Sequence, residues 1–193
     1  MKNRSSFVQR VTPGLWLAMV ASVTGQTATD QSPYVALEGR EIKALSPEQI
    51  EGYEAGLGMG LAMAAEMNGY PGPKHVLELR DELDLTEAQI QSTERVFGAM
   101  QEAARGLGRQ IVTQERELDR LFAAHDMDTS RLSERVMQLA ELQGQLRAAH
   151  LLAHLEMMQV LSHEQIERYI ELRGYRAAGH QAHHPEGGHS GDD

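Results

Sequence analysis

Two long stretches in which apolar residues recur every seven positions constrain this chain more than any other feature. The repeat positions are Phe97, Ala104, Ile111 and Leu118 in the first stretch and Leu132, Leu139, Leu146, Ala153 and Val160 in the second. A seven-residue apolar repeat is the pattern of a helix that packs along its length against another helix. The short polar segment 126–129 separates the two stretches, and Asp128 is placed to cap the second helix. We therefore predict a long antiparallel helical hairpin.

A six-residue motif, L-[ST]-x-x-Q-I, occurs three times. The positions that the three copies share include Leu45, Ser46 and Gln49 in the first, Leu85, Thr86 and Gln89 in the second, and Leu161, Ser162 and Gln165 in the third. The hydroxyl of each Ser or Thr can accept from the amide three residues on, and the Gln can reach back to the capping residue's own amide. The motif therefore predicts three helix starts. No stretch alternates apolar and polar residues with a period of two, so the predicted fold class is all-α, with shorter helices flanking the hairpin.

The segment after the first motif is rich in glycine and methionine. We predict one helix over residues 47–67, with glycines on one face where another helix or backbone comes close. Methionines four residues apart form a neighbouring face. Flexible, polarizable methionines suit a surface that binds varied client proteins, although ordinary core packing is the alternative. The glycines are Gly52, Gly56 and Gly60, and the methionines are Met59, Met63 and Met67.

The first 25 residues have the order of a secretory signal peptide: a basic start, an apolar run and then small residues. The apolar run from Leu15 to Val23 is shorter than the roughly 20 residues that span a bilayer. We predict cleavage before Gln26 and export to the periplasm, with a helical membrane anchor as the alternative. The predicted organisation is a signal peptide over 1–25, an extended polar arm over 26–44, a helical domain over 45–175 and a disordered His-rich tail over 176–193.

Composition excludes several classes of function. The net charge of −10 becomes −13 when the three basic residues of the signal peptide are removed, so nucleic acid is not an expected partner. The absence of cysteine excludes disulfides, thiolate metal sites and thiol nucleophiles. No serine lies in a recognisable nucleophile context, and the many carboxylates are typical of solvated helix faces. We therefore do not expect an enzyme.

The motifs Leu85–Gln89 and Leu161–Gln165, with the long hairpin between them, resemble the Spy/CpxP family of periplasmic L-T-x-x-Q proteins. Segments 58–62 and 68–73 resemble a subgroup of that family described as periplasmic heavy-metal sensors. The resemblance covers residues 45–175. It implies a hook- or cradle-shaped fold that forms an antiparallel dimer. It also implies ATP-independent holding of unfolded clients, regulation of an envelope stress response with a membrane-bound regulator, or metal binding.

Candidate metal ligands lie on the second long helix. His150 and His154 are four residues apart and so share one face, which is a recurring metal-ligand spacing. Met158 continues that face by one turn, and the resemblance implies a His and a Met ligand at this spacing. Sensor members also supply histidines from their first helix, where this chain has Glu48, Glu51, Glu54 and Glu66 instead. The alternative is that His150 is a tolerated core residue and His154 a surface residue.

The C-terminal tail is a second candidate for metal binding. Four of the nine histidines of the chain lie in its last fourteen residues: His180, His183, His184 and His189. Such imidazoles could bind zinc, copper or nickel without fixed geometry, and the alternative is a solubilising tail. No cofactor is required by either interpretation.

The expected function is that of an ATP-independent chaperone or envelope-stress factor, and the alternative is a heavy-metal sensor or buffer. We also predict a symmetric homodimer, because a two-helix hairpin has no third layer to cover its other faces. The apolar residues expected in the shared patch are Phe97, Phe122, Leu142, Leu151 and Leu155.

Overall fold

The computed structural model describes residues 32–175. The chain divides into two units, Met1–Val35 and Ala36–Asp193, and every α-helix described below belongs to the second unit. Every regular element between residues 32 and 175 is helical, which confirms the predicted all-α class. Within that same range, no helix combines the length and the apolar character that crossing a membrane requires.

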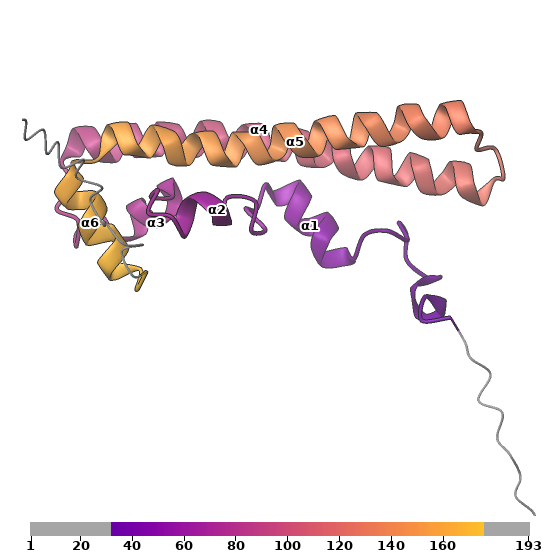
Figure 1. The fold of residues 1–193 in the computed structure, drawn as a ribbon, viewed down its shortest axis with the longest axis horizontal. Coiled ribbons are helices and arrows are strands. Elements are labelled where there is room, and N and C mark those ends of the chain that lie inside the picture. Colours follow the sequence, from indigo (N-terminus) through magenta and orange to yellow (C-terminus); the bar gives the residue numbers. More distant parts are fainter. Residues whose placement is uncertain (1–31, 176–193) are drawn as a thin grey trace, which may run out of the picture. The chain divides into compact units, whose positions relative to one another are not determined.

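The predicted hairpin is present. Helix α4 (Glu87–Ala123) and helix α5 (Thr129–Val160) pack side by side, and α4 ends at a short turn before Asp128 (Figure 1). The Asp128 carboxylate caps α5 by accepting from the Arg131 amide at 2.9 Å, as the sequence predicts. The seven-residue repeat supplies the interface, because a buried cluster between the helices consists of Ala104, Ile111, Leu139 and Leu146.

All three repeated motifs start helices, and each one forms a complete capping box. The capping residues are Ser46 for α1 (Pro47–Ala55), Thr86 for α4 and Ser162 for α6 (His163–Leu172). In each box the Ser or Thr oxygen accepts from the amide of the Gln three residues on, and the Gln oxygen accepts from the capping residue's amide. The three helix starts are therefore confirmed.

Two of the three motifs bind each other. Gln89 Nε2 donates to Gln165 Oε1 at 2.7 Å, and Gln165 Nε2 donates back to Gln89 Oε1 at 3.1 Å. Each amide also donates to a backbone carbonyl across the junction, Gln89 to Val160 and Gln165 to Leu83. The glutamine that closes each capping box thus joins the start of α4 to the start of α6.

The prediction of one helix over residues 47–67 is wrong, because the segment forms two helices separated by a loop. Helix α1 ends at Gly56, whose φ of +67° is left-handed, and α2 (Met63–Glu66) is a separate short helix. Gly60, at φ +78°, adds a second left-handed residue to the loop between them. Glycine adopts this conformation without the steric cost that a Cβ would add, so the glycines break the helix here.

A glycine does permit α1 to approach another helix closely, as predicted. The glycine with the tightest contact is Gly108, which lies on α4 and not on α1. A Cβ on Gly108 of α4 would collide with the backbone carbonyl of Tyr53 on α1. A Cβ on Gly56 would also lie only 3.1 Å from the carbonyl oxygen of Gln101. The backbone of α1 therefore packs directly against the backbone of α4, with no side chain between them at Gly108.

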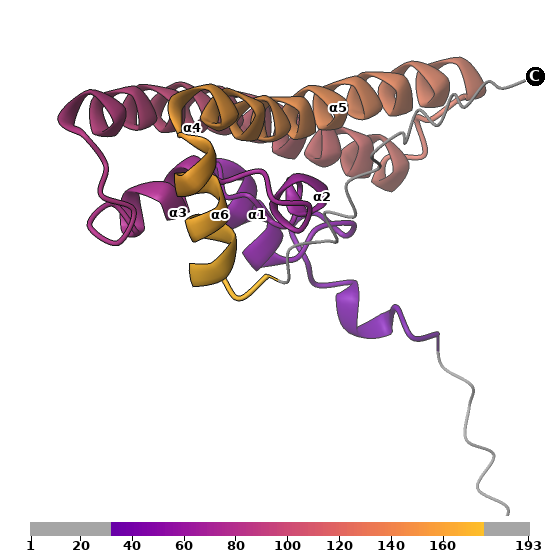
Figure 2. The same cartoon turned by 60° about the vertical axis from the view of Figure 1, so that its left-hand side comes forward.

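The remaining helices complete one side of the hairpin. Helices α1, α2 and α3 (Pro73–Glu78) follow one another along α4 and α5, and α6 turns back beside α3 (Figure 2). A second buried cluster joins α3, α5 and α6. Its members are Val76, Leu83, Met157, Leu161, Ile166 and Tyr169.

Residues 32–44 belong to the segment 26–44, which we predicted to be an extended polar arm. The structure shows a helical turn and a buried side chain among them. The turn is a 3-10 turn, η1 (Val35–Leu37), and Ile42 is fully buried against Leu45 and Val112. Lys43 Nζ lies 3.1 Å from an oxygen of Asp119 on α4. The signal peptide predicted over 1–25 and the tail predicted over 176–193 lie outside the described residues.

Candidate functional site

Three methionines between residues 59 and 67 line an open cavity. Met59, Met63 and Met67 are 43%, 58% and 58% exposed, and neighbouring Leu57 is 52% exposed. The alternative that the methionines pack in the core is therefore wrong. They line a cavity of about 560 Å³, together with Phe97 and Met100 of α4. We call this space the methionine cavity.

Three histidines and one glutamate also line the methionine cavity, and one of the histidines is His75 of α3. His150 and His154 come from adjacent turns of α5, and Glu66 comes from the end of α2. His150 and His154 are only 4% and 7% exposed. The expectation of a surface position for His154 is therefore wrong, because α2, α3 and the loop before α3 cover this side of α5. An apolar, methionine-lined space thus contains buried polar groups.

One oxygen of Glu66 is the centre of a hydrogen-bond network. Its Oε1 accepts from the Tyr169 hydroxyl at 2.6 Å, from Arg173 Nε at 3.1 Å and from the Tyr175 hydroxyl at 3.3 Å. Burial, followed by the bond to Glu66, raises the pKa of Tyr169, so this phenol stays a donor across the physiological range. The network fixes Glu66 against α6 and the residues that follow it.

The other oxygen of Glu66 is buried without a hydrogen-bond partner. It lies 3.8 Å from His154 Nδ1, too far for a hydrogen bond. A buried carboxylate oxygen without a donor is costly, because that oxygen has lost its contact with water and accepts no hydrogen bond in return.

His150 also has a buried side-chain atom that makes no hydrogen bond. Its Nε2 is the second buried side-chain atom without a partner within residues 32–175. Burial, with a smaller contribution from the neighbouring His154, lowers the pKa of His150, so the neutral imidazole is favoured. A neutral imidazole has one nitrogen lone pair available to a ligand.

His154 is oriented like a ligand. Its Nδ1 lies 2.8 Å from the carbonyl oxygen of Tyr70, which assigns the proton to Nδ1 and leaves the lone pair on Nε2. Gly72 keeps the space beside that nitrogen open. A Cβ there would stand 3.3 Å from His154 Nε2 and 3.1 Å from the unpartnered Glu66 oxygen. His154 Nε2 and Glu66 Oε2 therefore border the same small space.

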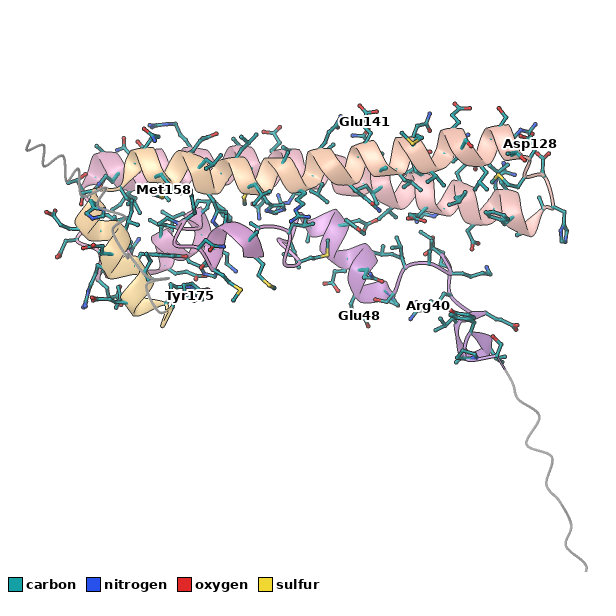
Figure 3. The ribbon with its side chains drawn as sticks, in the orientation of Figure 1. Arg40, Glu48, Asp128, Glu141, Met158 and Tyr175 are labelled. Carbon is teal, nitrogen blue, oxygen red and sulfur yellow. The ribbon has the colours of Figure 1, made fainter. Side chains whose placement is uncertain are left out.

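The structure brings together five of the candidate client-binding and metal-binding residues that the sequence singles out. His150, His154 and the three methionines line one cavity, although they come from different elements. Met158 does not join them; it packs against the cluster formed by α3, α5 and α6, and Figure 3 shows it on α5 near α6. Among residues 32–175, no three His, Asp or Glu side chains lie close enough to hold a metal ion together. The four tail histidines, His180, His183, His184 and His189, lie outside the described residues.

The network around Glu66 could not be predicted from the sequence, in which Glu66 is one of four glutamates of the segment 48–66. Its partners are Tyr169, Arg173 and Tyr175. The partners are separated from Glu66 by more than 100 positions, so no local pattern connects them. The one available signal is that Glu66 follows a methionine segment and precedes a Gly–Pro turn.

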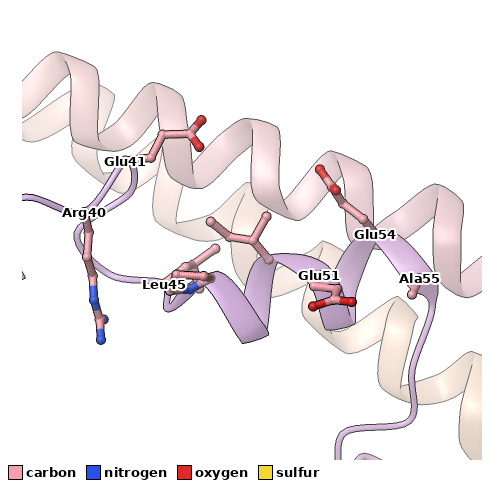
Figure 4. A pocket seen from close by; sticks show the side chains of 8 residues that line it. Arg40, Glu41, Leu45, Glu51, Glu54 and Ala55 are labelled. Atoms are coloured by element: carbon pink, nitrogen blue, oxygen red, sulfur yellow. The ribbon is translucent and has the colours of Figure 1, made fainter.

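A second cavity lies beside the first repeated motif. Its volume is about 510 Å³, and it is formed by Leu45, Pro47 and Ile50 with Arg40 and several glutamates around them (Figure 4). The glutamates are Glu41, Glu51 and Glu54. Its lining combines apolar side chains with one arginine and three glutamates, and none of its lining residues is a histidine or carries an unpartnered buried atom.

Comparison of the chain with protein-family models, curated proteins and solved structures found no match.

Proposed function

We propose that this chain is a binding protein that holds apolar segments of unfolded proteins in the methionine cavity, as an ATP-independent chaperone or envelope-stress factor. One observation carries the proposal: Leu57, Met59, Met63 and Met67 are all exposed and all line the same open cavity. Exposed large apolar side chains that gather in one place mark binding surfaces. The thioether side chains can repack around different partners, as promiscuous binding surfaces require.

The sequence features support the same class of function. The repeated motifs and the hairpin resemble the Spy/CpxP family, whose members include chaperones of this kind. The segment 1–25 has the order of an export signal, which supports a periplasmic location for the proposed activity. The homodimer and a membrane-bound envelope regulator remain the expected partners.

An aggregation assay tests the holding activity. A chemically denatured client is diluted into buffer with the mature protein, and light scattering follows its aggregation. We expect suppression at several-fold molar excess, and a marked loss of suppression in the double variant Met63→Ser and Met67→Ser. Both side chains are exposed, so the variant should keep its fold.

The matched control is Met137→Ser, an exposed methionine of α5 that does not line the methionine cavity. The Met137→Ser variant should suppress aggregation to the same extent as the unaltered protein does. No suppression by the unaltered protein, or equal loss in the control, would contradict the proposal.

A separate observation favours transition-metal binding as a second candidate function. Glu66 Oε2 and His150 Nε2 are buried without partners in the same cavity, and His154 presents Nε2 beside it. Imidazole nitrogen with carboxylate oxygen is a donor set that zinc, copper and nickel accept.

Calorimetry with zinc, copper and nickel tests this candidate. We expect binding that His150→Ala weakens at least tenfold. The control is His163→Ala, because His163 is an exposed residue of the first turn of α6 and does not line the cavity. Equal affinities for the His150→Ala variant and the unaltered protein would contradict a metal site in the cavity.

A further inference from the structure

The methionine cavity presents two hydrogen-bond acceptors to one small space. One is Glu66 Oε2, and the other is His154 Nε2, which carries the lone pair because Nδ1 lies 2.8 Å from the Tyr70 carbonyl oxygen. The point that a Cβ on Gly72 would occupy lies 3.1 Å from the Glu66 oxygen and 3.3 Å from the His154 nitrogen. The two acceptors are therefore close enough for a single group with several hydrogen-bond donors to bind both.

The basic side chains around this space bind other acceptors. Arg173 donates through Nε to Glu66 Oε1 and through Nη2 to the Tyr175 hydroxyl. Lys74 lines the cavity, but its Nζ forms an ion pair at 3.7 Å with Glu78. Among residues 32–175, no group donates a hydrogen bond to Glu66 Oε2. The donor that this oxygen lacks is therefore one that a bound partner can bring.

His150 is an independent sign that the cavity takes a polar ligand group. The residue is only 4% exposed, and it lines the same cavity. Within residues 32–175, its buried Nε2 makes no hydrogen bond. A buried polar atom without a partner raises the free energy of the protein, and a ligand that hydrogen-bonds to it removes that cost.

The chemistry of the acceptors favours a basic ligand group over a neutral one. An ammonium or a guanidinium carries several N–H donors, so either can donate to a carboxylate and an imidazole together. A carboxylate accepts a stronger hydrogen bond from a cation than from a neutral donor. The chain also has 28 acidic residues against 18 lysines and arginines, so its overall field attracts cations.

The rest of the cavity suits apolar side chains. Its exposed lining includes Leu57, Met59, Met63 and Met67. The volume of about 560 Å³ lies in the range of pockets that enclose a drug-sized ligand, so the cavity accommodates a few side chains and not a folded domain. A short apolar segment that carries one basic residue matches both parts of the lining.

We propose that the methionine cavity selects apolar client segments that contain a lysine or an arginine. The cationic end donates to Glu66 Oε2 and His154 Nε2, and the neighbouring apolar side chains of the client pack on the methionines. The inference rests on the proposed holding function and specifies its clients. A protein that held every exposed apolar segment would show no such preference.

A series of peptides tests the selection. The peptides are short and fluorescein-labelled, with leucines and serines around one central position that holds lysine, arginine, norleucine, glutamine or glutamate. Norleucine keeps the straight alkyl chain of lysine and lacks its ammonium group. Fluorescence anisotropy gives each Kd for the mature protein in buffer with EDTA, which removes metal ions. We expect the lysine and arginine peptides to bind about tenfold more tightly than the norleucine peptide, and the glutamate peptide to bind most weakly.

Two variants should abolish the preference by different routes. Glu66→Gln replaces the unpartnered oxygen by an amide group that donates, while the remaining oxygen can still accept from Tyr169. Gly72→Ala keeps both acceptors and places a methyl group beside them, at a φ of −85° that alanine adopts readily. In both variants the lysine peptide should bind about as weakly as the norleucine peptide. The control Glu141→Gln removes the same charge from an exposed residue of α5 outside the cavity, and it should keep the preference.

Two further readouts keep the test independent of protein folding. A variant that binds the norleucine peptide like the unaltered protein has kept its cavity. In the unaltered protein, the ¹³Cε1 NMR signal of His154 should shift more with the lysine peptide than with the norleucine peptide, and equal shifts would overturn the proposed contact.

The outcomes separate the selection from the holding function. Equal affinities for the lysine and norleucine peptides would overturn the selection and leave the holding function standing. A lysine preference that survives both cavity variants would also overturn it, because attraction to the acidic surface would then suffice. A glutamine peptide that binds as tightly as the lysine peptide would overturn the requirement for a cation. Absence of binding to every peptide would overturn the selection and the holding function together.

Discussion

At the scale of single residues, Gly108 determines how closely α1 can approach α4. Gly108→Ala places a methyl group against the Tyr53 carbonyl, so we expect it to lower the free energy of unfolding by about 1–3 kcal/mol. Gly106→Ala is the matched control on the same helix, because nothing lies within 4 Å of its Cβ position. That change should raise stability by up to about 1 kcal/mol. Urea unfolding of both variants checks the prediction, and equal effects would contradict it.

Two glutamates of α4 should respond to pH with opposite signs. Desolvation raises the pKa of Glu115, whereas Arg120 lowers the pKa of Glu117 chiefly through a side-chain hydrogen bond. Ionised Glu115 therefore costs stability as pH rises above its ordinary pKa, and ionised Glu117 contributes stability that is lost as pH falls through its lowered pKa. At pH 7, Glu115→Gln should raise the melting temperature and Glu117→Gln should lower it. Both differences should shrink at pH 3, and differences of the same sign at pH 7 would contradict the assignment.

At the scale of elements, the paired glutamines join the starts of α4 and α6. Gln89→Ala removes a capping interaction and the bonds to Gln165 and Val160, so we expect a loss of about 2–3 kcal/mol. Gln49→Ala is the control, since within residues 32–175 Gln49 makes only its own capping bonds. It should cost about 1 kcal/mol or less. Chemical unfolding measures both losses, and a double-variant cycle of Gln89 and Gln165 should give a coupling energy well above zero.

At the scale of the whole molecule, the predicted homodimer needs a revised set of contacts. Of the residues expected in the shared patch, Phe122 and Leu155 are exposed, whereas Leu142 packs against the core of the hairpin. Phe122→Asp and Leu155→Asp should therefore weaken the dimer without unfolding the chain. Leu142→Asp should instead lower thermal stability. Light scattering should give about twice the chain mass for the mature protein, and a monomer at micromolar concentration would contradict the dimer.

The elements of this fold were predictable because their determinants are local. A capping box involves residues three positions apart, and the apolar repeat involves residues seven apart, so both can be read along the sequence. Ser46, Thr86, Ser162 and Asp128 consequently cap the helices that the sequence indicates. The break at Gly56 was missed because a glycine inside a helical pattern tolerates either outcome. Its left-handed conformation depends on what packs beside it.

The composition of the site was decided by tertiary structure. The sequence by itself determined that His150 and His154 share a helix face and that methionines recur at Met59, Met63 and Met67. It did not determine that Glu66 would meet Tyr169 across 103 positions, or that His154 would be buried beside Gly72. Those contacts depend on α2 and α3 folding back over α5, which is settled by the joint burial of many side chains rather than by any short pattern.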